Sequence, residues 1–252
     1  MNIKMIVTDL DHTLLRRDKT ISKYTVDILK RIRKHGVLLA FATARDFRFV
    51  TEFITPMNNI EPDIIIADNG ALARYNGNDL YKKMLPSEVV NDLIKQLEVV
   101  RCISTEDAYF LCDDSSIDHW SIGKKGLVTA DFSKGIENDA FYLDGYIQSL
   151  QELTNKYPDI RAVKYSDVDL TTIVHKEATK LKALSAVASS LNIELNQIVA
   201  FGDDYSDIDM LSVCGYGVAV ANAINRVKAI ADYICDTNEN DGVAKWLEEK
   251  FL

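Results

Sequence analysis

Aspartates occur in two clusters, each directly after a run of apolar residues. Asp9 and Asp11 lie in MIVTDLDHTLL, and Asp203 follows QIVAFG, with Asp207 four residues further on. Carboxylates held within a few ångströms repel one another and raise each other's pKa. A divalent cation relieves this repulsion, since Mg²⁺ takes oxygen ligands and keeps waters and a substrate phosphate. The acids therefore predict a Mg²⁺ site with Asp9 and Asp203 as anionic ligands and Asp207 as a further candidate.

A hydroxyl and an ammonium group complement these acids. Thr43 ends the apolar run VLLAFAT, and Lys180 lies at the start of the helical segment TKLKALSAVASSLN. Hydroxyl, backbone amide and ammonium groups suit the outer oxygens of a phosphoryl group, and a helix N-terminus favours anions. We therefore expect Thr43 and Lys180 to bind phosphate.

Continuous apolar runs precede these residues, which is typical of strands buried on both faces of a parallel sheet. One intervening helix has Ser22 as its N-cap and Gly36 as its stop, and a second runs from about Asp46 to near Pro56. The predicted core strands are residues 4–9, 37–43, 63–67, 197–204, 216–220 and 233–236. This alternation predicts an α/β fold with a doubly wound, mostly parallel, Rossmann-like sheet, and ligands bind at the carboxyl edge of such a sheet.

The pattern changes in the middle of the chain. Asn76-Gly77 lies between two strand-like runs, which indicates a hairpin. The elements expected beyond it are helices at 87–100 and 146–157 and strands near 101–113, 140–144, 160–166 and 169–175. Strand pairs beside helices indicate an inserted α+β cap domain at 85–176, with 1–84 and 177–252 forming the core.

The composition narrows the class of function. The 252 residues include 29 Lys and Arg against 38 Asp and Glu, a net charge of −9, which argues against nucleic-acid binding. Asp9 follows the N-terminus too soon for a signal peptide, and no apolar run approaches the roughly 20 residues of a membrane span. We expect a cytoplasmic protein, monomeric or weakly dimeric, with neither a nucleic-acid nor a membrane partner.

The pattern D-x-D-x-T is weak evidence alone, because the chain contains it twice. The copy that begins at Asp9 follows an apolar run, whereas the copy that begins at Asp167 follows the polar stretch KYS. We interpret the second copy as a solvated loop of the cap. Tyr109, Phe110 and Trp120 are candidate pocket residues of the cap, although aromatic side chains more often belong to a core.

Four segments resemble the four motifs of the haloacid dehalogenase-like hydrolases: MIVTDLDHTLL, LLAFATAR, ATKLKAL and VAFGDDYSDIDML. The hairpin followed by a large insert, together with ADNGA, AVANA and NENDGVAKWL, is similar to the Cof-type phosphatases. The resemblance extends over nearly the whole predicted core and is weak in the cap. It implies phosphatase activity with Mg²⁺ as the cofactor.

The resemblance also implies roles for the matching residues. Asp9 is the nucleophile that forms an aspartyl-phosphate, and Asp11 is the general acid for the leaving alcohol and then the base for water. The phosphoryl oxygens are bound by Thr43, Lys180 and Asn222. The metal is held by Asp9, the backbone carbonyl of Asp11, Asp203 and Asp207, the last either directly or by orienting the metal's shell. A metal-bound carboxylate stays ionised, whereas a neighbouring side chain off the metal is expected to keep a higher pKa.

Three positions depart from the family pattern. His12 replaces the usual glycine, Ser206 replaces the usual asparagine, and Thr43-Ala-Arg45 varies a Ser/Thr-Gly-Arg motif. If position 12 requires a positive φ, a histidine there is strained. We expect Arg45 to pair with a carboxylate of the core rather than with the substrate.

The residues together predict a Mg²⁺-dependent phosphatase of a small phosphorylated metabolite, such as a sugar phosphate or a phosphorylated cofactor. The cap would set its specificity. A phosphomutase or phosphotransferase, which uses the same aspartyl-phosphate but passes the phosphoryl group to another acceptor, is the main alternative. A non-catalytic, phospho-accepting signalling domain is a further alternative, but such a domain would be much shorter and would have no cap.

Overall fold

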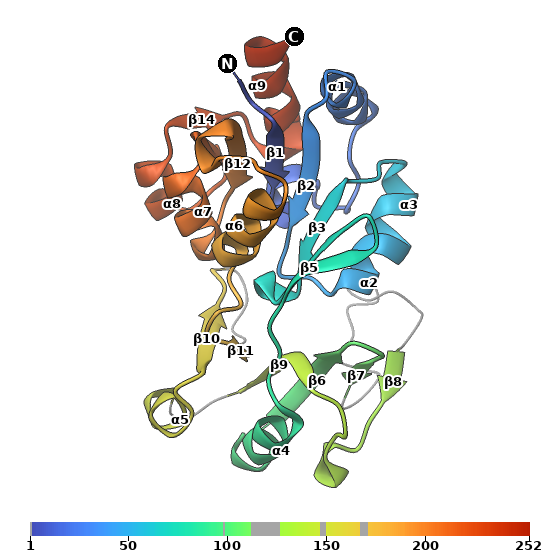
Figure 1. Ribbon diagram of the computed structural model, residues 1–252, viewed down its shortest axis with the longest axis vertical. Helices are drawn as coiled ribbons and strands as arrows, with labels where there is room; N and C mark the ends of the chain where they lie inside the picture. The colour runs from blue at the N-terminus through green and yellow to red at the C-terminus, as the bar shows by residue number, and fades with distance from the viewer. Residues whose placement is uncertain (1, 98, 112–126, 147–149, 167–170) are drawn as a thin grey trace.

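The computed structural model describes residues 2–97, 99–111, 127–146, 150–166 and 171–252, which form two β-sheets, one above the other in Figure 1. Within these residues the upper, core sheet has eight strands in the order β14-β13-β12-β1-β2-β3-β4-β5. The strands are β1 (Met5–Thr8), β2 (Leu38–Ala42), β3 (Ile64–Ala67), β4 (Leu72–Tyr75), β5 (Asn78–Lys82), β12 (Ile198–Gly202), β13 (Tyr216–Val220) and β14 (Tyr233–Cys235). From β14 to β3 every pairing is parallel, and β4 and β5 form an antiparallel hairpin at the edge. The predicted doubly wound, mostly parallel sheet is therefore confirmed.

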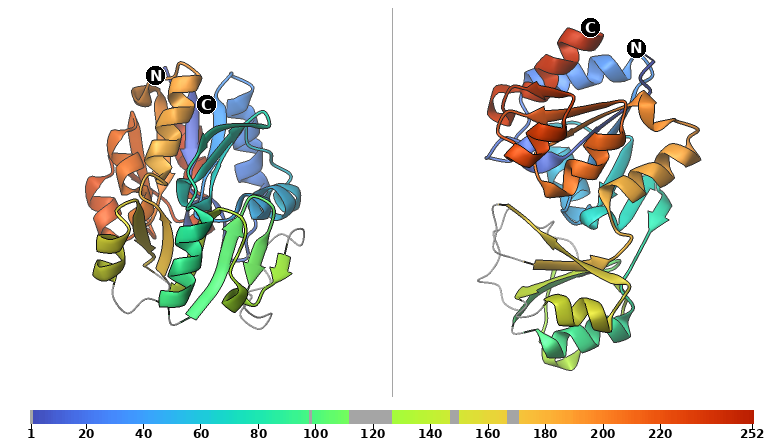
Figure 2. Two further views of the ribbon diagram at one scale, coloured as in Figure 1. Left: turned by 60° about the horizontal axis from the view of Figure 1, so that its bottom comes forward. Right: turned by 90° about the vertical axis from the view of Figure 1, so that its left-hand side faces the viewer.

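Helices cover both faces of the core sheet (Figures 1 and 2). The longer ones are α1 (Lys23–Arg33), α6 (Lys180–Ser190), α7 (Ile208–Val213), α8 (Asn225–Ile230) and α9 (Gly242–Phe251). α1 packs against α9, whereas α7 packs between α6 and α8. Ser22 caps α1 as expected, because its Oγ accepts a hydrogen bond of 3.0 Å from the backbone N–H of Thr25. No helix in the described part of the chain is both long and apolar enough to cross a membrane.

The helix expected to end near Pro56 ends at Asn58, two residues further on. It consists of α2 (Phe47–Phe49), a π-turn (Val50–Ile54) and α3 (Thr55–Asn58). Proline inside a regular α-helix loses one hydrogen bond and clashes with the carbonyl four residues earlier. The wider π-turn directly before Pro56 changes that geometry, so the helix continues to Asn58.

The helix expected at 87–100 ends earlier than its apolar spacing indicates. α4 is Ser87–Gln96, Leu97 is already extended, and Val99 begins a strand. Two β-branched valines at 99 and 100 favour a strand, and they pair with the backbone of the neighbouring strand. Pairing in the sheet therefore overrides the helical spacing here.

The second sheet lies between α4 and the core and has the order β10-β11-β9-β6-β7-β8. Its strands are β6 (Val99–Thr105), β7 (Tyr109–Leu111), β8 (Leu127–Thr129), β9 (Ala140–Tyr146), β10 (Ile160–Lys164) and β11 (Thr171–His175). α4 and α5 (Leu150–Lys156) cover the face away from the core (Figure 2). The opposite face brings Cys102, Tyr109 and Tyr142 against Ala71 and Leu72 of the core. We retain 85–176 as the proposed cap domain.

The two segments that connect the sheets are bound to each other. The hydroxyl of Tyr81 donates a hydrogen bond of 2.7 Å to the backbone carbonyl of Glu177. The ammonium of Lys83 lies 2.8 Å from the carboxylate of Glu177. The chain therefore leaves the core and returns to it at adjacent points.

Ser104 of β6 joins the cap to two buried acids of the core. Its Oγ lies 2.7 Å from Oδ2 of Asp46 and 2.9 Å from Oδ1 of Asp68. A hydroxyl has one hydrogen and can donate to only one of them. Burial and the charge of Asp46 raise the pKa of Asp68. Ser104 therefore donates to one of the two acids at a time, and Asp46 is also paired with Arg48.

Candidate active site

Asp9 lies at the carboxyl end of β1, in the middle of the core sheet. β1 pairs with β2 and β12, and the backbone N–H of Asp9 donates to the carbonyl of Phe201 at 3.0 Å. The side chain is buried, and its Oδ1 accepts a hydrogen bond of 2.7 Å from Nζ of Lys180. Among the described residues Oδ2 has no hydrogen-bond partner, so it is available to another group.

Lys180 reaches Asp9 from the first turn of α6. Thr179 caps this helix, and its Oγ1 accepts a hydrogen bond of 3.0 Å from the backbone N–H of Lys182. The Lys180 ammonium also lies 2.7 Å from Oδ1 of Asp207. Burial lowers the pKa of Lys180, but the charges of Asp207 and Asp9 outweigh burial and raise it. Lys180 is therefore a fixed cation between two acids.

A close backbone approach fixes the position of this lysine. Gly70, with φ +83°, lies against the start of α6, and a Cβ at this position would be 2.3 Å from the carbonyl carbon of Thr179. Only glycine allows both the left-handed backbone and this contact. The segment DNG at 68–70 thus supports the helix end that carries Lys180.

Asp203 and Asp207 follow β12, the neighbour of β1. Oδ2 of Asp207 accepts hydrogen bonds from the backbone N–H groups of Asp203 and Asp204, at 3.0 and 3.1 Å. Thr13 donates a hydrogen bond of 2.7 Å to Oδ1 of Asp203. Burial and the charge of Asp207 raise the pKa of Asp203 to about 7. The structure thus brings the second acid cluster beside the first.

Three of the four predicted metal ligands provide a compact set of oxygens. One carboxylate oxygen from each of Asp9, Asp203 and Asp207 lies within 4.8 Å of the others, and all three side chains are buried. Burial and the neighbouring acids raise the pKa of Asp9 although Lys180 opposes the rise. Three carboxylates share one lysine here, so a cation with oxygen ligands fits the site.

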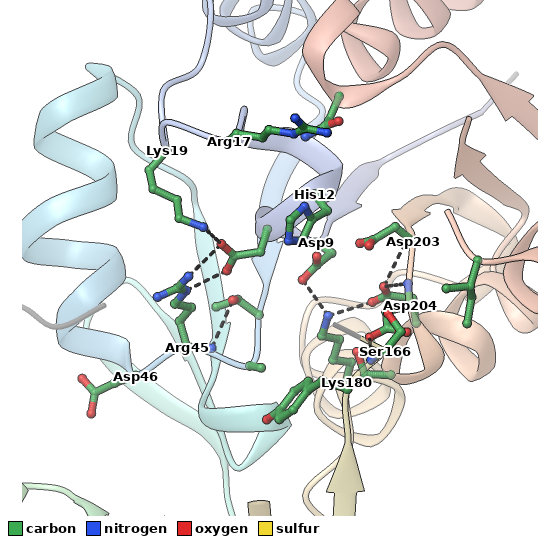
Figure 3. A pocket seen from close by; sticks show the side chains of 18 of the residues that line it. Asp9, His12, Arg17, Lys19, Arg45, Asp46, Ser166, Lys180, Asp203 and Asp204 are labelled. Carbon is green, nitrogen blue, oxygen red and sulfur yellow. Dashed lines mark hydrogen bonds and ion pairs between the residues drawn. The ribbon is translucent and has the colours of Figure 1, made fainter. Parts of the chain in front are cut away.

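Asp11 has very different surroundings from Asp9. Arg45 donates to both of its oxygens, at 2.7 and 2.9 Å, and the ammonium of Lys19 lies 2.7 Å away. In Figure 3 Lys19 and Arg45 converge from one side, opposite Lys180 and Asp203. Burial raises the pKa of Asp11, but the two cations outweigh burial and lower it. The expectation that Asp11 keeps a raised pKa is therefore wrong for this arrangement, whereas Arg45 does pair with a carboxylate as expected.

Three further residues line the same cavity. Thr43 is buried, and its Oγ1 accepts a hydrogen bond of 3.1 Å from the backbone N–H of Arg45. The amide of Asn222 donates to the carbonyl of His12 at 2.7 Å and accepts from the N–H of Asn238 at 3.0 Å. Asn222 thus holds two loops together, and its contact with phosphate stays a prediction. His12 has φ +58°, so the chain adopts the left-handed turn that glycine favours, despite the side chain.

These side chains open into one cavity of about 840 Å³ between the core sheet and the cap sheet. The core wall carries Asp9, Lys180 and Asp203, and the cap wall contributes Tyr109 and Asp144. Among the described residues Tyr109 both lines the cavity and packs in an apolar cluster, whereas Phe110 packs against the cap core. Trp120 and the second D-x-D-x-T copy, up to Leu170, lie outside the described residues.

Sequence reasoning missed the cap residues Asp144 and Tyr165, which also line the cavity. It also missed the pairing of Lys19 with Asp11. No spacing signal marks these positions, because strand pairing within the cap and between domains brings them to the site. The segment AFYLDGY, an acid among apolar and aromatic residues in a strand, was the available signal for Asp144.

The family follows from a match over most of the chain. Residues 6–247 match the model of the haloacid dehalogenase-like hydrolases, and the chain belongs to this family. Within the family it is a Cof-type phosphatase, that is, a phosphoric monoester hydrolase. The resemblance noted in the four sequence motifs is thereby confirmed.

Known relatives agree with this assignment over the full length. The chain is 30% identical over 270 residues to the 5-amino-6-(5-phospho-D-ribitylamino)uracil phosphatase YitU of Bacillus subtilis (strain 168), with 98% of this chain and 97% of the relative covered. A haloacid dehalogenase-like hydrolase from Bacteroides thetaiotaomicron has a similar structure, with a TM-score of 0.85 and 26% identity over 99% of this chain and 100% of that one. The protein TM0651 from Thermotoga maritima gives a TM-score of 0.84 at 25% identity, covering 99% and 98%.

Proposed function

We propose that the protein is a Mg²⁺-dependent phosphatase that hydrolyses a small phosphate monoester through an aspartyl-phosphate on Asp9. The observation that carries the proposal is the carboxylate of Asp9, which is bound to Lys180 through one oxygen while its other oxygen is without a partner among the described residues. Asp203 and Asp207 lie beside it. This set provides a nucleophile, a cation for phosphoryl oxygens and ligands for a metal.

Asp9, the backbone carbonyl of Asp11, Asp203 and Asp207 would hold the metal. Asp203 has one oxygen on Thr13, whereas Asp207 has hydrogen bonds on both of its oxygens. Asp207 therefore suits the task of orienting Lys180 and the loop at 203–204 as much as direct ligation. When bound, Mg²⁺ offsets the charge of the carboxylates and of the phosphoryl group.

The reaction proceeds in two displacements on phosphorus. An oxygen of Asp9 forms a bond to phosphorus while the bond to the leaving alcohol breaks, and Asp11 gives its proton to that alcohol. Water then attacks the aspartyl-phosphate, Asp11 takes a proton from the water, and Asp9 is released with inorganic phosphate. Lys180 and Thr43 contact the phosphoryl oxygens in both steps.

Asp11 must change its partners to act as the acid. In the structure two cations hold it in the ionised form. We propose that Asp11 turns away from Arg45 and Lys19 when a phosphate ester binds, and that its pKa then rises beside the phosphoryl group. The ion pairs of Asp11 with Arg45 and Lys19 then belong to the site before substrate binds.

The substrate is a phosphorylated small metabolite, either a sugar phosphate or a phosphorylated cofactor. The relative named for acting on 5-amino-6-(5-phospho-D-ribitylamino)uracil supports a metabolite of this size. The cavity of about 840 Å³ has room for such a molecule.

Free phosphate and protein stability together test the proposal. Incubation with para-nitrophenyl phosphate should release inorganic phosphate with Mg²⁺ and none after EDTA, and Asp9→Asn should be inactive. Mg²⁺ should also raise the melting temperature of the wild type, because it binds the folded site only, and should do so much less in Asp203→Asn. Full activity in EDTA would contradict the metal assignment, and transfer of the phosphoryl group to a sugar without free phosphate would indicate a phosphomutase.

A further inference from the structure

The cap wall of the cavity contains a half-buried carboxylate that has no ion-pair partner among the described residues. Asp144 lies on β9 and faces the cavity. Its Oδ1 accepts a hydrogen bond from the hydroxyl of Thr172, and its Oδ2 accepts one of 3.1 Å from Sγ of Cys102. No Lys, Arg or His in the described part of the chain lies within ion-pair distance of it, although the charge of Arg101 lowers its pKa. A carboxylate that lines a cavity without an ion pair is available to a hydrogen-bond donor on a bound molecule.

Two short chains of neutral hydrogen-bonding groups end at Asp144, one through Cys102 and one through Thr172. The hydroxyl of Tyr109 donates to Sγ of Cys102 at 2.9 Å, and the hydroxyl of Tyr165 lies 3.0 Å from that of Thr172. Burial raises the pKa of Asp144 to about 6, while the hydrogen bonds from Thr172 and Cys102 and the charge of Arg101 oppose the rise. The carboxylate is therefore mostly ionised at neutral pH and presents acceptor lone pairs toward the cavity.

Flat aromatic groups surround this acceptor. Tyr109 and Tyr142 are buried and pack edge to face, with ring centroids 6.3 Å apart, and Tyr165 lines the same cavity. Arg101 lines it too and donates to the hydroxyl of Tyr146 at 3.3 Å. Aromatic walls with one acceptor between them suit a planar group that carries hydrogen-bond donors.

We propose that Asp144 is a specificity-determining residue that accepts N–H hydrogen bonds from the leaving group, and that the preferred ester has a nitrogen-bearing head. This inference rests on the proposed phosphatase function of Asp9. Asp144 already accepts hydrogen bonds from two neutral donors, the hydroxyl of Thr172 and the thiol of Cys102. A sugar hydroxyl would add only a third neutral donor. An amino group or an acidic ring N–H carries more positive charge and makes a stronger hydrogen bond to the carboxylate.

Matched pairs of esters test the inference. Flavin mononucleotide and ribitol 5-phosphate share the ribityl phosphate and differ in the N–H-bearing ring. Glucosamine 6-phosphate and glucose 6-phosphate differ in an amino group in place of a hydroxyl. In at least one pair, the wild type should hydrolyse the nitrogen-bearing ester with a kcat/KM about 10- to 100-fold higher, which is the range for a hydrogen bond to a charged group.

Asp144→Asn should remove most of this preference, mainly through a higher KM for the nitrogen-bearing ester. The loss should exceed any loss with para-nitrophenyl phosphate by at least tenfold. Asp159→Asn is the matched control, because Asp159 is an exposed cap acid paired with Lys176, and this variant should keep the preference. Equal kcat/KM values within both pairs for the wild type, or a preference that persists in Asp144→Asn, would overturn the inference.

Binding separates this inference from the proposed function. In the Asp9→Asn background, flavin fluorescence should report binding of flavin mononucleotide that weakens at least tenfold when Asp144→Asn is added. Such weakening would support the role of Asp144 even if no ester were turned over. Hydrolysis of para-nitrophenyl phosphate without discrimination in either pair would leave the phosphatase standing and refute the role of Asp144.

Discussion

Two aspartates that are two residues apart in the sequence have opposite electrostatic surroundings. Asp9 lies among other acids and one lysine, and burial raises its pKa. Asp11 lies between Arg45 and Lys19, and these cations lower its pKa. The sequence pattern identified both carboxylates but could not predict this difference, because Arg45 and Lys19 arrive from other segments of the chain.

Replacement of the two aspartates should separate the two chemical steps. Asp11→Asn should reduce hydrolysis of alkyl phosphates by about 10²- to 10⁴-fold, the usual contribution of general acid–base catalysis. The loss should be smaller for para-nitrophenyl phosphate, whose leaving group departs without a proton. With that ester, phosphoenzyme should accumulate on Asp9 and be detectable by mass spectrometry after acid quench. Phosphate found on Asp11 or Asp203 instead would contradict the assigned roles.

Asp144 should reduce the stability of the fold while it serves the site. Its folded-state pKa of about 6 lies above the usual value, so the folded state binds the proton of Asp144 more tightly than the unfolded chain does. Its contribution to the free energy of unfolding is therefore highest at low pH and falls as the pH rises through about 6. Asparagine stays neutral throughout. The free energy of unfolding of Asp144→Asn, measured in urea and compared with that of the wild type, should therefore rise by about 1 kcal/mol from pH 5 to pH 8. A relative stability that stays constant over this range would argue that the carboxylate is not perturbed.

At the scale of elements, the core could be predicted well because its strands and caps are encoded locally. Ser22 and the Asn76-Gly77 turn were predicted from side-chain chemistry, and both Asn76 and Gly77 have positive φ. The end of α4 was not predicted correctly, because cross-strand pairing decides it. The residues of the cap that line the site were not predicted either, because they come from strands that are far apart in the sequence.

The contact between Gly70 and the start of α6 should matter for both stability and phosphate binding. Gly70→Ala adds a methyl group where the nearest backbone atom is 2.3 Å away, at φ +83°. Gly36→Ala is a matched control, since its φ is +80° and nothing lies within 4 Å. In both variants the free energy of unfolding should fall by about 1–2 kcal/mol because of backbone strain. Gly70→Ala should lose about 1–3 kcal/mol more from the clash, and its KM for phosphate esters should rise as Lys180 shifts. Equal effects of the two variants in urea unfolding would show that the contact is unimportant.

At the scale of the whole molecule, Ser104 is the polar contact by which the cap rests on Asp46 and Asp68. Ser104→Ala leaves two buried acids without their shared hydroxyl, so the free energy of unfolding should fall by about 1–3 kcal/mol. Ser212→Ala removes an exposed helix hydroxyl and should change stability by less than about 0.5 kcal/mol. Limited proteolysis should also cut the connecting segments faster in Ser104→Ala. Unchanged cleavage and stability would show that the cap is held by other contacts.

The bond between Tyr81 and Glu177 and the ion pair between Lys83 and Glu177 have a consequence for how such proteins diversify. These two contacts hold the segment at which the chain leaves the core sheet against the segment at which it returns. A foreign insert whose own ends lie equally close could be spliced in there without disturbing the acid cluster. If the proposed function holds, replacing the cap should change the preference for a leaving group while the acid cluster of the core keeps its geometry.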